Sequence, residues 1–464
     1  MNKERIKNWV LVGLVLLSFS LTMQLWLSVP IERVVPGDQA FSGQDSEEIY
    51  DLSSFVLPQW MVVNFGGQSH TKLIKDSSSQ GFFDEVYAGI SEIMEYIFAG
   101  EQNITFTEAS GDEWAAARES KSIEVEYAWA FDTTIFSELF GGGANRESIP
   151  MAGIKGLTVT LGANRAVYFK DGIKDTIYKL ELPESHQELD QLVNRLEEHD
   201  PVKYWTLKEI GYSDDNSFYV PLDMSSFNLP VGTAEKELDT SAPAVLDAQA
   251  SNFFSDMSVV RKITEMDGSV IYTDSQTALL RIDSTGFLEY MVYSYAAGDK
   301  NRADIVSAID AALMFISVHG GIPGQLYLQE AREVEESGLR GHLMRFNYAY
   351  NGLPFFRKGG LENSAIEVTV VEGKVVRYTR NVHHVTRAKI VQKPLLYPVK
   401  AADVVAEATS SPGGTKSLPA IQDMYLGYCI DMKGSKEHQV YPVWYIETGD
   451  GAFIVDAYEG RLVE

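Results

Sequence analysis

The sequence predicts an α+β protein in which helices pack on antiparallel sheets, and three patterns support this class. Apolar residues recur with the 3.6-residue period of a helix in a few separate segments, such as residues 82–98. Alternating runs separated by Gly turns indicate neighbouring antiparallel strands, as in residues 269–293. Residues 9–29 carry no charge, which indicates one N-terminal transmembrane helix ahead of these elements.

The composition limits the size of the protein and the kinds of partner it can have. Its 464 residues suggest about three domains, and 45% hydrophobic residues are enough for several cores. The formal net charge of −26 repels phosphate backbones, so we expect no nucleic-acid partner. Cys429 is the only cysteine, which excludes an intramolecular disulfide and a cysteine-based metal site.

Residues 9–29 are predicted to form an uncleaved transmembrane helix. The segment has 21 residues, and about 20 apolar residues span the bilayer core. Trp9 and Trp26 lie at its two ends, as aromatic anchors at membrane interfaces do. The alternative is a cleaved secretory signal, which has a shorter apolar region and small residues before its cleavage site, where this chain has Trp26.

The tail of residues 1–8 sets the predicted orientation. Lys3, Arg5 and Lys7 outweigh Glu4, and positive residues stay on the cytoplasmic side of a membrane. We therefore expect a single-pass protein of the cell membrane with its N-terminus in the cytoplasm. Residues 30–50 are a polar linker, and the rest of the chain is predicted to be extracytoplasmic.

Three polar side chains within the span are candidate contacts with a partner helix: Ser18, Thr22 and Gln24. Serine and threonine are often tolerated in membrane helices because they bond to backbone carbonyls of their own helix. Gln24 lies near the outer interface, where either a partner helix or water satisfies its amide. The sequence leaves both interpretations open.

The extracytoplasmic part is predicted to begin with two domains, residues 51–165 and 166–297. The first contains a buried strand, an amphipathic helix, a half-buried strand and two strands near its end: residues 59–65, 82–98, 124–131, 156–161 and 165–170. The second contains a helix, an irregular stretch and a three-stranded meander: residues 185–199, 222–244, 269–273, 276–282 and 287–293.

Residues 298–464 are predicted to form a C-terminal domain of two similar halves, each a helix followed by a small meander. The first half has a helix at 303–318 and strands at 325–332, 341–349, 364–372 and 374–382. The second half has a helix at 401–408 and strands at 420–430, 439–447, 451–456 and 461–463.

No catalytic signature appears in the sequence, so we expect no catalytic residue, no metal and no cofactor. The nucleophile-elbow, zinc-protease, phosphate-loop and calcium-loop patterns are missing. The tripeptide His319–Gly320–Gly321 resembles the oxyanion loop of some esterases, but two glycines after an apolar helix more often end that helix. His383 and His384 are adjacent in a predicted strand, so they point to opposite faces and cannot chelate one ion.

The remaining polar and aromatic groups are interpreted as surface and core. Acidic clusters are expected to be solvated, with an external Ca²⁺ site as the alternative: Asp214, Asp215, Glu333, Glu335 and Glu336. Tyrosine pairs on one strand face are expected to pack in a core, with a ligand platform as the alternative: Tyr293 with Tyr295 and Tyr348 with Tyr350. Cys429 is expected to be buried in its apolar strand.

Several motifs taken together resemble the YycH family. They are the tail MNKERIK running into the apolar span, the stretch SVVRK at 258–262 with the DG and YTD that follow it, and the closing pattern YPVWYI, GDG, IVDA and EG at 441–460. The likeness in length, anchor and domain order covers essentially the whole chain. The closing segment also resembles PepSY-type modules, which implies PepSY-like repeats in the last portion.

The YycH resemblance implies a non-enzymatic regulator of the sensor histidine kinase YycG (WalK), which controls cell-wall metabolism in low-GC Gram-positive bacteria. Family members act with a second single-pass protein, YycI, through their transmembrane helices. They lower kinase activity in bacilli and raise it in staphylococci, so the sign is not predicted here. The rival hypotheses are an extracytoplasmic enzyme or inhibitor related to peptidases, which the PepSY likeness suggests, and a tethered receptor for a wall fragment or peptide.

Overall fold

The computed structural model describes most of the chain that follows the predicted linker. The described residues are 50–75, 81–99, 104–141, 149–182, 187–212, 218–293, 304–336, 338–358, 364–409, 420–431 and 437–463. The predicted tail, membrane helix and linker, residues 1–49, lie outside them. Among the helices that are described, none has both the length and the apolar character needed to cross a membrane.

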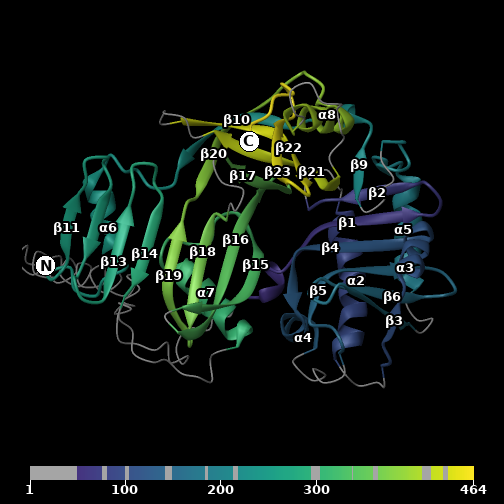
Figure 1. Cartoon of the computed structure of the whole chain (residues 1–464), viewed down its shortest axis with the longest axis horizontal. Coiled ribbons are helices and arrows are strands. Elements are labelled where there is room, and N and C mark those ends of the chain that lie inside the picture. Colours follow the sequence, from purple (N-terminus) through teal and green to yellow (C-terminus); the bar gives the residue numbers. More distant parts are fainter. Residues whose placement is uncertain are drawn as a thin grey trace, which may run out of the picture. The chain divides into compact units, whose positions relative to one another are not determined.

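The first sheet is built from antiparallel strands of residues 58–221. Its strands are β1 (Pro58–Phe65), β2 (His70–Leu73), β3 (Thr107–Ala109), β4 (Lys121–Asp132), β5 (Gly153–Thr160), β6 (Ala166–Asp171), β7 (Thr176–Glu181), β8 (Tyr204–Thr206) and β9 (Tyr219–Pro221). Nine strands lie in the order β3-β7-β6-β5-β4-β1-β2-β8-β9 (Figure 1). The predicted domain boundary after residue 165 falls within this sheet, because Val167 of β6 pairs with Val159 of β5.

Three helices cover one face of the first sheet: α2 (Phe82–Phe98), α4 (Thr133–Gly141) and α5 (Gln187–Glu198). Helix α2 lies where the sequence predicts it, because its apolar residues recur at helical spacing and are buried. Along β1, Met61 and Val63 join the core under these helices, whereas Trp60 and Val62 belong to a cluster on the other face. This alternation follows from the two-residue period of a strand.

A buried polar network lies on the other face, beside α3 (Gly111–Glu119). The Glu124 carboxylate accepts hydrogen bonds from Asn64 Nδ2 at 2.7 Å, from the Tyr219 hydroxyl at 2.6 Å and from Arg118 Nε at 2.7 Å. A buried carboxylate is tolerated when donors surround it in this way. The network ties α3 and β9 to the central strands β1 and β4.

The second sheet takes its strands from residues 230–456. They are β10 (Pro230–Lys236), β11 (Arg261–Thr264), β12 (Val270–Thr273), β13 (Ala278–Ile282), β14 (Leu288–Val292), β15 (Gln325–Glu336), β16 (Leu339–Tyr350), β17 (Leu353–Arg357), β18 (Ile366–Val371), β19 (Lys374–Arg380), β20 (His383–Ile390), β21 (Ile421–Asp431), β22 (Glu437–Thr448) and β23 (Gly451–Asp456). The order is β11-β12-β13-β14-β19-β18-β16-β17-β21-β22-β10-β20, with β15 beside β16 and β23 beside β22. All pairs are antiparallel except β17 with β21.

The helices and meanders predicted for residues 269–464 are confirmed, with α7 (Ile305–Val318) against β16, β18 and β19, and α8 (Pro398–Thr409) against β22 and β23. The exception is the strand predicted at 461–463, where the structure has only an isolated bridge between Val455 and Leu462. The described elements also include α6 (Pro243–Ala250) and the 3₁₀ turns Leu52–Ser54 and Met224–Ser226. The meander β11–β14 joins β19 through the pair Tyr290 and Tyr378. The predicted boundary after residue 297 therefore also falls within one sheet.

The prediction of an irregular stretch over residues 222–244 is wrong for β10. This strand pairs with β20 on one side and with β22 on the other. Its sequence has no clear alternation, so its hydrogen-bond partners, which lie more than a hundred residues further along, decide its conformation. Gly232 is required there, because a Cβ at this position would lie 2.3 Å from the carbonyl oxygen of Arg387.

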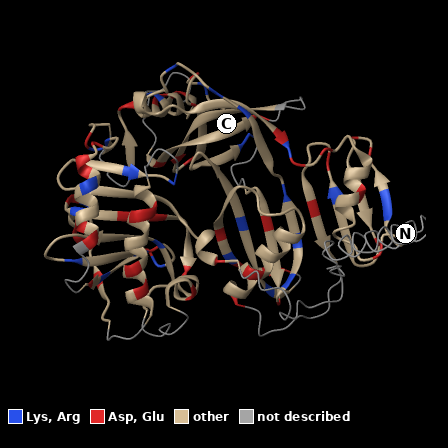
Figure 2. Cartoon of the chain, turned by 180° about the vertical axis from the view of Figure 1, so that it is seen from behind, with Lys and Arg blue, Asp and Glu red and all other residues tan. Residues whose placement is uncertain are grey.

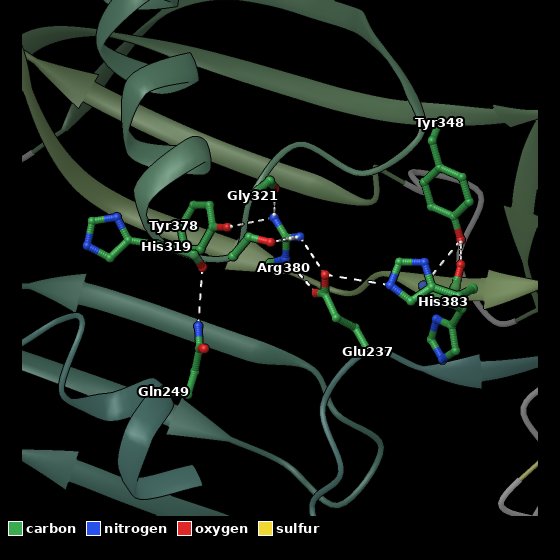
Figure 3. Close-up of polar contacts among 10 residues, drawn as sticks. Glu237, Gln249, His319, Gly321, Tyr348, Tyr378, Arg380 and His383 are labelled. Atoms are coloured by element: carbon green, nitrogen blue, oxygen red, sulfur yellow. Dashed lines mark hydrogen bonds and ion pairs between the residues drawn. The ribbon is translucent and has the colours of Figure 1, made fainter. Parts of the chain in front are cut away.

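Arg380, the last residue of β19, is buried and joins three segments of the second sheet (Figure 3). Its guanidinium donates to both carboxylate oxygens of Glu237 at 2.6 Å and to the carbonyl oxygens of Gly320 and Gly321 at 2.9 Å. Glu237 follows β10, and the two glycines follow α7. Four hydrogen bonds from one side chain therefore hold together segments that are far apart in the sequence.

We predict that Gly320→Ala destabilises the protein by about 3 kcal/mol, because an added Cβ would lie 2.8 Å from Arg380 Nε and Cζ. Gly321→Ala is the matched control, since a Cβ there meets nothing within 4 Å and only the positive φ of +75° is strained. That strain costs about 1 kcal/mol. Urea unfolding of the two variants measures the difference, and equal losses would show that Arg380 does not constrain this loop.

His319 at the end of α7 gives a second prediction, on acid stability. The ring stacks on Phe315 with 3.7 Å between centroids, and burial lowers the pKa of His319 from 6.5 to about 4. The unfolded chain binds this proton as the pH falls below about 6.5, whereas the folded chain does so only near pH 4. The histidine therefore lowers stability as the pH falls through that window.

We expect His319→Phe to reduce the acid-induced loss of unfolding free energy between pH 7 and pH 4.5 by up to about 3 kcal/mol. Urea unfolding at several pH values is the measurement. His384→Phe serves as the control because this side chain is 57% exposed. Parallel pH curves for the wild type and His319→Phe would contradict the prediction.

Candidate functional site

Eight residues that the sequence singles out for membrane anchoring and partner contact lie outside the described residues: Lys3, Arg5, Lys7, Trp9, Ser18, Thr22, Gln24 and Trp26. The structure neither brings them together nor separates them, so their roles stay predictions. In the described part of the chain, the candidate sites are the other sequence motifs and the cavities.

The tripeptide His319–Gly320–Gly321 ends α7, as the helix-ending interpretation predicts. The carbonyl oxygens of both glycines accept hydrogen bonds from Arg380. An oxyanion loop presents N–H donors to its ligand, whereas this loop presents its carbonyl acceptors to Arg380. The motif is therefore part of the junction around Arg380.

The adjacent histidines of β20 point to opposite faces, as predicted. His383 is buried and packs against His438 of β22 with 5.3 Å between ring centroids, while His384 is largely exposed. Burial lowers the pKa of His383 to about 3, so the ring is neutral at physiological pH. In the described part of the chain, no group of three or more metal-ligating side chains occurs.

Most of the other predicted surface and core residues are where they are expected. The glutamates of β15 are exposed, namely Glu333, Glu335 and Glu336. Tyr348 stacks on Phe355, and Tyr350 packs edge-on against Tyr428, so this pair contributes to packing. Cys429 is fully buried. Tyr293 is 60% exposed, so the expectation that it packs in a core is wrong. Asp214, Asp215 and Tyr295 lie outside the described residues.

A cavity of about 230 Å³ lies where the start of β1, the start of β15 and the β16–β17 turn meet. Its wall is mainly apolar and includes Phe55, Leu57, Leu326 and Pro354. Lys75 adds a positive charge to the wall. The volume is slightly below the 300 Å³ or so at which drug-sized pockets begin, which suits a small ligand.

A second cavity of about 30 Å³ shares Gln59, Gly352 and Pro354 with the first. Its other wall residues include Trp60 of β1, Lys72 of β2 and Tyr425 of β21. The larger cavity and this smaller one are called the two-cavity site below. The site brings strands of the first sheet opposite strands of the second.

Two donors in the smaller cavity lack an acceptor among the described residues. Trp60 Nε1 is buried and has no hydrogen-bond partner, although buried donors are nearly always paired. Lys72 Nζ lies 4.5 Å from the centre of the Trp60 ring, and no described carboxylate forms an ion pair with it within 4 Å. Burial lowers the pKa of Lys72 to about 8, although Asp423 and Glu126 counteract the shift.

The acids near this lysine are also affected by their surroundings. Burial raises the pKa of Asp423, with Lys72 opposing the shift, and burial raises the pKa of Glu126, with Lys155 opposing it. Lys155 Nζ lies 3.4 Å from Glu126 Oε1. Elsewhere on the first sheet, Lys and Arg are likewise interspersed with Asp and Glu (Figure 2). The charged side chains that line the cavities are Lys72 and Lys75, and the acids Asp423 and Glu126 lie near Lys72 without lining either cavity.

Aromatic side chains of the second sheet lie next to these acids. Tyr445 stacks on Phe356 and on Tyr425, with 5.1 Å and 4.9 Å between ring centroids. Tyr425 also lines the smaller cavity. The sequence did not single out this site, because Trp60 and Lys72 lie more than 350 residues away from Tyr425. The one local signal is a lysine within the short and largely buried strand β2.

Comparison with known proteins adds to this picture. Residues 245–459 match the family model described as the C-terminal domain of the YycH protein. The crystal structure of YycH from Bacillus subtilis matches with a TM-score of 0.56 and 12% identity, covering 87% of this chain and 96% of that chain. An uncharacterised protein from Eubacterium rectale matches with a TM-score of 0.35 and 12% identity, covering 51% of this chain and 86% of that chain. No curated protein matches the chain.

The family match and the likeness to the Bacillus subtilis structure agree with each other and with the motifs in the sequence. At 12% identity the likeness to the Bacillus subtilis protein shows a shared fold, and it extends over both sheets because it covers 87% of the chain. The family match adds a relationship in sequence over β11 to β23. The resemblance to the YycH family noted in the sequence is confirmed, by the family model over residues 245–459 and by the shared fold.

Proposed function

We propose that the chain is a non-enzymatic, membrane-anchored regulator of the sensor histidine kinase YycG (WalK). The observation that carries the proposal is the match of residues 245–459 to the YycH C-terminal domain, because the YycH family implies regulation of the YycG two-component system. The sequence supports the non-enzymatic part, because it contains none of the catalytic signatures discussed above. The fold alone would not suffice, since one fold serves many functions.

The proposed route of regulation is contact between transmembrane helices. Residues 9–29 are charge-free and follow a basic tail, which supports a single-pass protein with its bulk outside the cell. Only this helix and the short tail would reach the cytoplasmic kinase domains. Any influence on the kinase therefore passes through this helix or through the helices of a partner such as a YycI-like protein.

The two-cavity site favours one alternative, a tethered receptor for a small external molecule. Its mainly apolar wall and the buried Trp60 Nε1, which has no hydrogen-bond partner among the described residues, are features of a ligand site. The two functions are compatible, because a receptor domain outside the cell can be coupled to a kinase through the same membrane helix. The PepSY likeness of the C-terminal halves remains part of the proposal without an observation of its own.

The proposed membrane topology can be tested by labelling single cysteines. In a Cys429→Ala background, a cysteine at exposed Lys208 should react with a membrane-impermeant maleimide in intact cells. A cysteine at Asn2 should react only after the cells are opened, because the tail is placed in the cytoplasm. Labelling of Asn2→Cys in intact cells, or loss of the first residues from the mature chain, would contradict the anchored topology.

The proposed contact between transmembrane helices can be tested by replacing the predicted span. Replacing residues 9–29 with an unrelated apolar span should abolish regulation, read with a YycG-dependent reporter after expression and export are confirmed. The single change Gln24→Leu should weaken the complex only about 3- to 30-fold, since an interhelical hydrogen bond contributes about 0.6–2 kcal/mol. Ser28→Leu, at the end of the span, is the matched control. Full regulation by the swapped chain would place the kinase contact in the external domains.

A further inference from the structure

We propose that the two-cavity site binds a small carboxylate with an apolar body, with the carboxylate beside Lys72 and Trp60 and the body in the larger cavity. The inference does not depend on kinase regulation, because it concerns binding by the protein alone. The same chemistry occurs in a medium-chain aliphatic acid and in the acylated C-terminal residue of a peptide, and the experiment below separates these two sources.

The unpaired donors identify the charged end of the ligand. Trp60 and Lys72 both line the smaller cavity, and the Trp60 indole N–H and the Lys72 ammonium group can donate but not accept hydrogen bonds. Trp60 is 7% exposed, so water reaches its indole N–H poorly, and a buried donor without an acceptor costs about 1–3 kcal/mol. An oxygen of a carboxylate would satisfy the indole N–H and pair with the ammonium group.

The neighbouring charges restrict the choice further. A cationic ligand head would face Lys72 directly and is therefore disfavoured. A doubly charged phosphate is disfavoured as well, because Asp423 and Glu126 lie close enough to Lys72 to influence its charge. A single negative charge is the one that two donors can hold without strong repulsion from these two acids.

The larger cavity identifies the body of the ligand. Its wall is formed mainly by apolar side chains from Phe55, Leu57, Leu326 and Pro354, which favour an aliphatic or aromatic group. The volume of about 230 Å³ corresponds to roughly eight water molecules of bulk liquid. Gln59, Gly352 and Pro354 line both cavities, so the two cavities adjoin, and the proposal is that one ligand reaches from one into the other.

Lys75 offers a competing position for the carboxylate, because it lines the larger cavity instead of the smaller one. Its side chain is half-buried, whereas Trp60, the other donor at the preferred end, is almost fully buried. A carboxylate gains more from a donor that water does not reach. The proposal therefore places the head at Lys72, and a substitution of each lysine distinguishes the two orientations.

The test is calorimetric titration of the full-length chain in lipid nanodiscs with two carboxylates, octanoate and N-acetyl-leucine. Their neutral analogues octanamide and N-acetyl-leucinamide are the matched ligands. We expect at least one carboxylate to bind about 10- to 100-fold more tightly than its amide, as a charge-assisted hydrogen bond provides. Preference for octanoate would indicate a lipid-derived ligand, and preference for N-acetyl-leucine a peptide end.

The variants locate the head. In Lys72→Met, the affinity for the carboxylate should fall to the affinity for its amide. Trp60→Phe keeps an aromatic ring but removes the indole N–H, and it should weaken carboxylate binding about 3- to 10-fold. Lys389→Met is the matched control, because Lys389 is exposed on β20 and lines neither cavity. If Lys72→Met does not fold, Trp60→Phe and the amide comparison still decide the question.

Three results would overturn the proposal. The first is the absence of saturable binding of either carboxylate at millimolar concentration. The second is equal binding of a carboxylate and its amide, which would mean that the donors play no role. The third is loss of the carboxylate preference in Lys75→Met but not in Lys72→Met, which would place the head at the other end of the site.

Discussion

The buried guanidinium of Arg380 is the constraint on which the arrangement of the second sheet depends. It joins the residue after β10, the end of β19 and the loop after α7, which are separated by 60 to 143 positions in the sequence. The two carbonyls that it contacts lie at the C-terminal end of α7, where a positive charge is favoured by the helix dipole. Glu237 neutralises the guanidinium, so neither charge is left unpaired away from water.

A second constraint connects the two sheets. Before β1 begins, the segment around Phe55 packs on the later part of the chain, and the Phe55 carbonyl accepts a hydrogen bond from the N–H of Leu328 in β15 at 2.9 Å. The same buried cluster contains residues of α2, α4 and α7. The walls of the two-cavity site are therefore held by elements that belong to a shared core, and the site does not rest on loops alone.

The sequence predicts those parts of the fold whose pattern is local. Helices α2 and α7 carry a continuous apolar stripe, and β12–β14 alternate, with Gly286 in the turn between β13 and β14, so each has a signal within a few residues. Strand β10 has no such signal, because its two partner strands decide its conformation. The pairing of β14 with β19 has no local signal either, since it depends on residues that are far apart in the sequence. Trp60, Lys72 and Tyr425 could not be associated before their strands were placed in space.

The position of β10 between β20 and β22 also affects how the protein folds and how it can be divided. Residues 230–236 must pair with residues near 383–390 and 437–440, so the sheet closes only through contacts between residues far apart in the sequence. Such contacts slow folding. The stretch that matches the family model begins at residue 245, after β10 has ended. A fragment cut at that point would have two neighbouring strands with unpaired edges, and such edges recruit other chains. The segment that the family model recognises, residues 245–459, is therefore shorter than the segment needed for a closed sheet, which must also include β10.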